Sequence, residues 1–178
     1  MIFSRRSFWI LVAVTLGVYL VMVFWSLPLI AEAAGGQTPF DMRPGGYSYD
    51  DAQAFLVALS PEGRAFYLST QHKFDLIYPP LLGLMLGFAL WHQLGGVPKP
   101  LRLISVLLCG AVTITDLWEN ALVAQMLRLD PTDLTTEIVA KASGVTVAKS
   151  TLTTIAMGLL LVAICVRALL RRKQRKDA

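Results

Sequence analysis

The sequence predicts an all-α protein: a four-helix transmembrane bundle with two short amphipathic helices in the outer segment between spans one and two. The chain has 178 residues, of which 55% are hydrophobic and only 16% are charged. In a soluble domain about a quarter of the residues are charged. The apolar residues gather in four runs of about 20 or more, the length that crosses a bilayer. We therefore expect a single membrane domain over residues 1–178, without room for a soluble enzyme domain.

The four spans are expected at about 8–30, 74–94, 101–127 and 145–170, and each is followed or preceded by polar sequence. Basic residues precede the first span, lie between the second and third, and form a tail at 171–178. Because positive charge is enriched on the cytoplasmic side, this pattern places both termini in the cytoplasm. The segment 31–73 and the loop near 128–144 then lie outside.

The net charge of +4 comes from the basic tail directly after the fourth span. A cluster in that position indicates contact with anionic membrane lipids and a cytoplasmic orientation, and no nucleic-acid partner is expected. The motif at 4–8 resembles a twin-arginine export signal, and 31–33 resembles a signal-peptidase site. The apolar run between them is longer than the core of a signal peptide, so we expect an uncleaved anchor, with cleavage as the alternative.

The outer segment 31–73 contains starting signals for two short helices. Ser48 with Asp51 three residues later is an acidic variant of the capping box and predicts a helix over 49–59. Ser60 followed by Pro61 predicts a second start. We expect the two helices to lie across the outer mouth of the bundle, either covering a site or resting on lipid headgroups.

The second span carries two prolines and two glycines with opposite expected effects. Pro79 and Pro80 remove two backbone donors and predict a kink or a restart of the helix. Gly83 and Gly87 form a small-xxx-small pair, which lets another helix approach closely.

Polar residues in the third span are the strongest functional signal. Asp116, Glu119 and Asn120 are spaced i, i+3, i+4, so they share one helix face. The rise of a helix places both carboxyls roughly 20–24 Å from the inner end of the span, in the outer half of the membrane. Charges at that depth normally face a cavity, a pathway or a partner.

Asp75 and Tyr78 on the second span and Lys149 on the fourth fall at a similar depth, so we expect one shared polar pocket. Lys149 is the expected counter-ion of Glu119 or Asp116, and the excess of carboxyls favours a protonated one. Asp116 and Glu119 are therefore the candidate catalytic acid/base residues. The candidate binding residues are Asp75, Tyr78, Asn120 and Lys149. A structural clasp that fixes helix register is the alternative.

Two single histidines, His72 and His92, have no neighbours at metal-ligand spacing, so no metal site is expected. The sequence also lacks a nucleophile motif, a phosphate-binding loop and a haem-binding signature, and no cofactor is expected.

Three sequence blocks are familiar: FDMR with GYS at 40–48, DLIYP at 75–79 and DLWEN at 116–120. They resemble an uncharacterised group of small bacterial four-span membrane proteins, over most of residues 38–170. This resemblance implies the bacterial inner (cytoplasmic) membrane and implies no activity. More loosely, the architecture resembles the sterol-isomerase and sigma-2-receptor group, which implies an apolar ligand held over buried carboxylates. The histidine–glutamate pattern of the isomerases is not evident on the second span, where Asp75 stands instead.

These observations support two hypotheses. In the first, a polar pocket facing the outer leaflet binds a lipid or other amphipathic small molecule, with acid/base chemistry by Asp116 or Glu119 as an open addition. In the second, the protein is a non-catalytic accessory or assembly subunit of a larger membrane complex, and the Gly83/Gly87 face and the outer helices contact a membrane protein partner. Ion conduction is a weaker third hypothesis, because the inner halves of the spans contain almost no polar residues. Whether the protein is an enzyme stays open.

Overall fold

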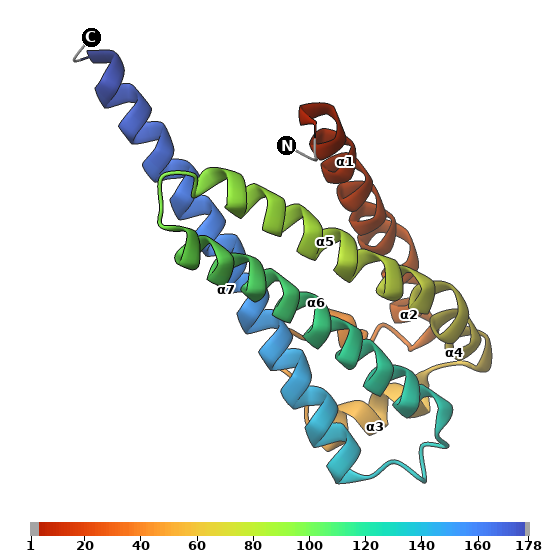
Figure 1. Ribbon diagram of the computed structural model, residues 1–178. Helices are drawn as coiled ribbons and strands as arrows, with labels where there is room; N and C mark the ends of the chain where they lie inside the picture. Colours follow the sequence, from red (N-terminus) through yellow and green to blue (C-terminus); the bar gives the residue numbers. More distant parts are fainter. Residues whose placement is uncertain (1–3, 177–178) are drawn as a thin grey trace.

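The computed structural model describes the backbone of residues 4–176 and the side chains through residue 172, so part of the expected basic tail at 171–178 lies outside the described residues. Over this range the chain is all-helical, without strands, which confirms the predicted all-α class (Figure 1). Two π-helical turns (η1 and η3) and one 3-10 turn (η2) occur beside the α-helices. In chain order the elements are α1 (Arg5–Val21), η1 (Met22–Ser26), α2 (Leu27–Ala33), η2 (Phe40–Met42), α3 (Tyr49–Ala58), α4 (Pro61–Phe66), η3 (Tyr67–Gln71), α5 (His72–Gln93), α6 (Lys99–Arg128) and α7 (Thr136–Lys176).

Four helices are long and apolar enough to cross a membrane: Arg5–Ala33, Pro61–Gln93, Lys99–Arg128 and Thr136–Arg172. The four predicted spans are thereby confirmed, and the chain is a multi-pass membrane protein. The two termini and the turn between α5 and α6 lie at one end of the bundle, which we call the terminal end (Figure 1). Residues 34–60, which contain η2 and α3, fold across the opposite end; we call this segment the cap and that end the cap end.

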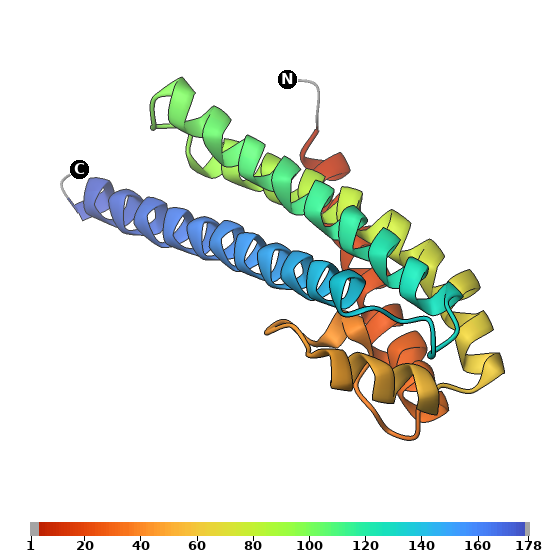
Figure 2. The ribbon, with the colours of Figure 1, turned by 90° about the horizontal axis from the view of Figure 1, so that it is seen from below.

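α5 lies at the centre of the bundle. It packs against α6, α1 and α7, and α6 packs in turn against α7 (Figures 1 and 2). α1 has its main helical contact with α5, so it flanks the other three helices on one side. α1 and α7 thus both pack against α5, and α3 of the cap packs against the cap-end part of α7 (Figure 2).

The cap contains one short helix where the sequence predicted two. The predicted Ser48/Asp51 capping box is present at the start of α3. The second predicted helix is not separate, because α4 continues through η3 into α5 as one helix from Pro61 to Gln93. The Ser60 hydroxyl caps this helix by accepting a hydrogen bond from the Gly63 N–H (3.0 Å). The second span therefore begins at Pro61 rather than near residue 74.

The cap is held down by aromatic packing and by hydrogen bonds to the bundle. The ring centroid of the buried Phe40 lies 4.8 Å from those of Tyr47 and Phe55. The Tyr47 N–H donates to Ser143 Oγ on α7 (2.9 Å), and the Ser60 N–H donates to the Ala33 carbonyl (2.9 Å). The cap therefore has a core of its own and closes the end of the bundle.

The prolines do not interrupt α5, which runs through both of them. Pro79 has no N–H to donate to the Asp75 carbonyl one turn earlier. The Asn120 side chain on α6 replaces that donor, with Nδ2 at 2.7 Å from the Asp75 carbonyl oxygen. The expected restart is absent because a neighbouring helix satisfies the freed carbonyl, as membrane helices require.

The predicted packing role of Gly83 is confirmed, and its neighbour is α6 of the same chain. Thr113 Oγ1 donates to the Pro79 carbonyl (3.1 Å). A Cβ on Gly83 would lie 2.0 Å from this hydroxyl oxygen, so only glycine allows the approach. Both Gly83 and Gly87 are buried.

Candidate functional site

A buried ion pair between α6 and α7 forms one side of the site. Lys149 Nζ pairs with the Glu119 carboxylate and lies 3.5 Å from Asp116 Oδ1. Glu119 is fully buried and also accepts a hydrogen bond from the Thr146 hydroxyl. The predicted role of Lys149 as counter-ion is confirmed for both carboxyls. A carboxylate at such a site needs this pairing, because an unpaired buried charge is strongly unfavourable.

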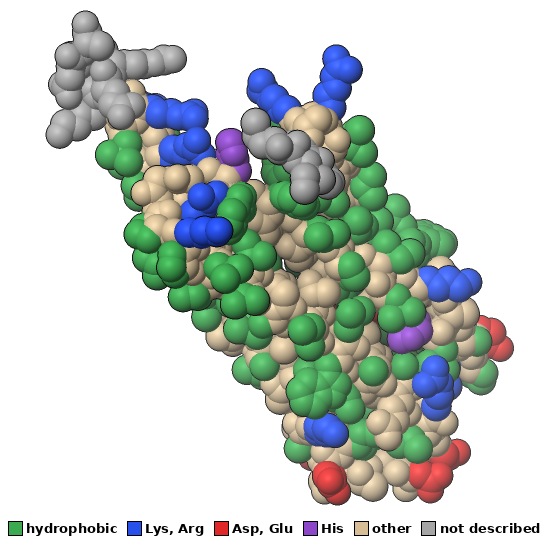
Figure 3. Space-filling view, in the orientation of Figure 1, with side chains coloured by type: hydrophobic (Ala, Val, Ile, Leu, Met, Phe, Trp, Pro, Cys, Tyr) green, Lys and Arg blue, Asp and Glu red, His purple; other side chains and the backbone are tan. Residues whose placement is uncertain are grey.

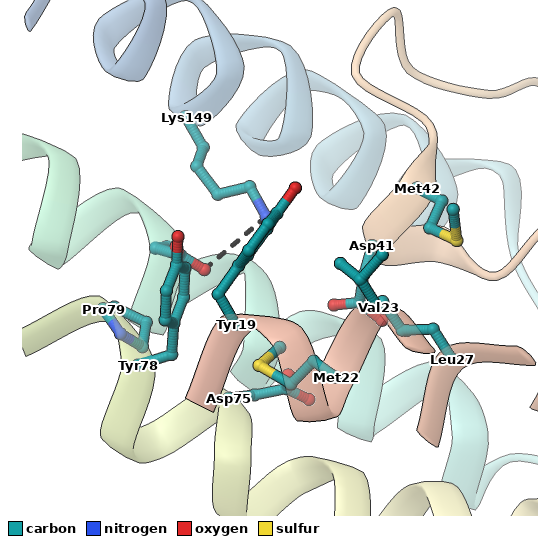
Figure 4. A pocket seen from close by; sticks show the side chains of 11 residues that line it. Tyr19, Met22, Val23, Leu27, Asp41, Met42, Asp75, Tyr78, Pro79 and Lys149 are labelled. Atoms are coloured by element: carbon teal, nitrogen blue, oxygen red, sulfur yellow. Dashed lines mark ion pairs between the residues drawn. The ribbon is translucent and has the colours of Figure 1, made fainter. Parts of the chain in front are cut away.

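Next to this ion pair lies a cavity of about 310 Å³ (Figure 4). It is bounded by α1, η1 and α2 of the first span, by α5, α6 and α7, and by η2 of the cap. Its polar lining consists of three carboxyls and one ammonium group, from Asp41, Asp75, Asp116 and Lys149. The remaining lining is aromatic, aliphatic or thioether: Tyr19, Met22, Val23, Leu27, Met42, Tyr78 and Pro79.

Two tyrosines form the aromatic wall. The rings of Tyr19 on α1 and Tyr78 on α5 are stacked, with centroids 5.9 Å apart and an interplanar angle of 29°. Tyr19 is 44% exposed, so its ring also borders the membrane-facing surface. The pocket therefore borders the side of the bundle where α1 packs against α5.

The position of the Asp75 carboxyl depends on the two π-helical turns. Each π turn inserts one extra residue into a helix and shifts the side chains around it. Ser26 of η1 donates to Gln71 Oε1 of η3 (2.6 Å), and Gln71 Nε2 donates to Asp75 Oδ1 (2.7 Å). All three side chains are buried. This hydrogen-bonded chain links the first and second spans and fixes one oxygen of Asp75.

The cap contributes Asp41 to the cavity. Asp41 lies in η2 and accepts a hydrogen bond from the Tyr67 hydroxyl of η3 through Oδ2. Tyr47, also in the cap, is buried beside Thr146 and Glu119. Burial raises the pKa of the Tyr47 hydroxyl, the Thr146 contact lowers it, and the nearby Glu119 raises it further, which keeps the phenol protonated. The cap is therefore part of the site and not only a cover.

The predicted site residues divide into two groups. Asp75, Tyr78, Asp116 and Lys149 line the cavity. Glu119 and Asn120 are absent from the lining: Glu119 lies behind Lys149, and Asn120 uses its amide to satisfy the Asp75 carbonyl. Among the described residues, no group of three or more His, Cys, Asp or Glu side chains is placed to hold a metal ion.

Sequence reasoning did not select three residues that matter here: Asp41, Tyr19 and Gln71. Asp41 lies in the FDMR block, but an aspartate in a loop has no periodicity that reveals its depth. Tyr19 is one aromatic residue in a uniformly apolar span. Gln71 precedes Asp75 by one helical turn, and this i, i+4 spacing was a usable signal.

The chemistry of the arrangement follows from its mixed lining. Carboxyl oxygens and an ammonium group lie among rings, methyl groups and sulfur (Figure 4). Such a cavity suits a small molecule with a polar head and an apolar body. Comparison with protein-family models, curated proteins and solved structures finds no match to this chain.

Proposed function

We propose that the chain is a bacterial inner-membrane protein that binds a lipid or other amphipathic small molecule in this pocket. The observation that carries the proposal is the cavity of about 310 Å³, whose lining combines three carboxyls and Lys149 with apolar and aromatic side chains. A cavity of this size is at the lower end of ligand sites and holds a head group with a short length of chain. The rest of an aliphatic chain would pass beside Tyr19 into the bilayer.

The distribution of charge supports cytoplasmic termini and a pocket on the outer side. Arg5, Arg6 and Lys99 are exposed at the terminal end, together with Arg171 and Arg172. On the face drawn in Figure 3, Asp and Glu side chains lie toward the cap end, whereas Lys and Arg occur at both ends. Cytoplasmic ends of membrane proteins are enriched in Lys and Arg, so the cap would face the periplasm.

The first span belongs to the proposed binding site, which supports a retained anchor. Tyr19, Met22 and Val23 of the first span line the cavity, and Ser26 donates to Gln71. Removal of this helix would take away one wall of the pocket.

Acid/base chemistry would fall to Asp116 rather than to Glu119. Asp116 lines the cavity and lies 3.5 Å from Lys149 Nζ, whereas Glu119 faces Lys149 and Thr146 behind the lining. A general acid or base must reach the proton that it transfers. Asp116 would therefore transfer the proton, and Lys149 would stabilise the charge that develops.

Native mass spectrometry of the protein extracted in mild detergent tests the proposed binding. In Val23→Trp the indole would fill the cavity, whereas the control Val14→Trp places the same indole on the exposed face of α1. We expect a lipid or small molecule to be retained by the wild type and by Val14→Trp and lost from Val23→Trp. Retention that is equal in all three proteins, or no bound molecule in any of them, would contradict the proposal.

The accessory-subunit hypothesis is a second outcome of this experiment. Its expected contact face at Gly83 and Gly87 is buried against α6 of the same chain, which weakens it. A stoichiometric protein partner with an empty pocket would support it and would replace the ligand-binding proposal.

A further inference from the structure

We propose that the pocket selects a cationic head group, a primary ammonium, through the free carboxylate oxygens of Asp41 and Asp75, which line the cavity together with the rings of Tyr19 and Tyr78. The inference rests on the proposed function and names the class of its ligand.

The first step is the balance of charge around the cavity. Asp41, Asp75 and Asp116 line it, Glu119 lies directly behind, and Lys149 is the one cation among the described lining residues. Lys149 is already paired with Glu119 and lies near Asp116. Asp41 and Asp75 have no ion pair among the described residues. Asp75 is buried and Asp41 is half-buried. The excess of carboxyls favours a protonated one in the empty pocket, and a bound cation would supply the compensation that lets both ionise.

The second step is the free hydrogen-bonding capacity of these two carboxyls. Asp41 accepts from Tyr67 through Oδ2, and Asp75 accepts from Gln71 through Oδ1. The other oxygen of each has no hydrogen-bond partner among the described residues. Asp75 is only 6% exposed, so bulk water does not solvate it freely. An ionised carboxylate only accepts hydrogen bonds, and an ammonium group presents three donors, whereas an alcohol presents one.

The third step is the aromatic and thioether part of the lining. The stacked rings of Tyr19 and Tyr78 present aromatic surface to the cavity, and aromatic faces attract cations. Met22 and Met42 offer polarisable thioethers to the carbon atoms next to the nitrogen. An anionic head would meet an excess of carboxylates, so the pocket is expected to reject it.

A matched set of probes tests the head-group preference. Binding of n-octylammonium, n-octanol and n-octanoate to the wild-type protein in lipid nanodiscs is measured by equilibrium dialysis, with binding to empty nanodiscs subtracted. The three probes share one chain and differ in charge. We expect n-octylammonium to bind at least about tenfold more tightly than n-octanol, because a charge-assisted hydrogen bond adds about that much affinity. We expect n-octanoate not to bind.

Two charge-removing variants assign the preference to the pocket. Asp41→Asn and Asp75→Asn keep an oxygen that can accept from Tyr67 and Gln71, and Asp133→Asn removes the same charge from an exposed position in the loop between α6 and α7. We expect each pocket variant to reduce n-octylammonium binding about tenfold and Asp133→Asn to leave it unchanged. Val23→Trp should abolish binding of every probe.

The outcomes separate the two proposals. If n-octanol and n-octylammonium bind equally and both are lost in Val23→Trp, the ammonium preference is wrong and the proposed amphiphile pocket is supported. An ammonium preference that is unchanged in both Asn variants would also overturn this inference. Binding of none of the probes would overturn both proposals.

Discussion

At the scale of single residues, Lys149 determines the charge balance in the middle of the bundle. Its ammonium group pairs with Glu119, which is fully buried, and lies near Asp116, which is 8% exposed. Charged side chains within a membrane helix are unfavourable unless they find partners. The ion pair therefore joins α6 to α7 and also sets the charge at the edge of the cavity.

The first prediction concerns this lysine. Lys149→Met removes the cationic partner of the fully buried Glu119 carboxylate and is expected to destabilise the protein by about 3–5 kcal/mol, because an uncompensated charge remains. SDS titration of the purified protein, followed by tryptophan fluorescence, measures the change.

A double variant provides the control. Lys149→Met with Glu119→Gln leaves no unpaired charge at Glu119, so we expect it to regain much of the lost stability. A single Lys149→Met variant as stable as the wild type would contradict the importance of this pair.

At the scale of elements, the π turns and the proline of the helices form hydrogen bonds to neighbouring helices. The two π turns bring Ser26 and Gln71 together, and Pro79 frees the carbonyl that Asn120 contacts. The two π turns and the carbonyl freed by Pro79 are thus each contacted by a side chain from a neighbouring helix. Irregular backbone is tolerated in membranes under this condition.

The second prediction tests the link between Pro79 and Asn120. In Asn120→Ala the Asp75 carbonyl loses its donor, and Pro79 has no N–H to replace it. We expect this variant to destabilise the protein by about 1–3 kcal/mol. In a Pro79→Ala background, the new N–H of residue 79 can donate to the same carbonyl. We therefore expect the loss caused by Asn120→Ala to become small there. A double-mutant cycle from SDS or thermal unfolding measures this coupling, and independent effects of the two substitutions would exclude it.

The third prediction compares the two glycines of α5. A Cβ on Gly83 would lie 2.0 Å from Thr113 Oγ1 and 3.2 Å from the Cys109 carbonyl oxygen. Gly83→Ala should therefore separate α5 from α6 and destabilise the protein by about 1–3 kcal/mol. At Gly87 the nearest atom would be 3.9 Å away, an ordinary contact, so Gly87→Ala is the matched control and should be tolerated. Thermal unfolding in detergent compares the two, and equal midpoints would contradict the close approach at Gly83.

At the scale of the whole molecule, the bundle has two different ends. The terminal end carries the short turn between α5 and α6, where the Arg102 guanidinium lies 4.0 Å from the centre of the Trp91 ring. The cap end carries the folded cap and the loop between α6 and α7. There the Arg64 guanidinium donates to the carbonyls of Leu127, in the last turn of α6, and Leu129, just after it, both at 2.8 Å. The polar groups of the site lie toward the cap end, so a ligand would enter from that side of the membrane.

The fourth prediction is the orientation in the membrane. In a Cys109→Ser/Cys165→Ser background, a cysteine at Asp133 is expected to react with a membrane-impermeant maleimide in intact spheroplasts. A cysteine at Gly96, in the turn at the terminal end, should react only after permeabilisation. Both positions are exposed. The reverse pattern would place the pocket on the cytoplasmic side.

Much of the fold could be predicted from the sequence, because the bilayer imposes it. Runs of apolar residues of membrane-spanning length define the four spans, and the spacing of Asp116, Glu119 and Asn120 shows their shared helix face. The depth of Lys149 along its span was enough to predict its pairing with Glu119 or Asp116, and the structure shows it near both. The capping box of α3 was equally readable, since it depends on residues three positions apart.

The sequence by itself therefore determined the helical class, the number of spans and the depth at which polar groups meet, because these follow from hydropathy and from the helical rise. Only the tertiary structure decided which of those groups face the cavity: Asp116 lines it, while Glu119 and Asn120 are turned to Lys149 and to the Asp75 carbonyl. It also brought Asp41 from the cap and Tyr19 from α1 into the same site. The reason is physical. Depth along a span is a property of one helix, whereas the rotation of each helix and the folding of the cap depend on packing between segments far apart in the chain.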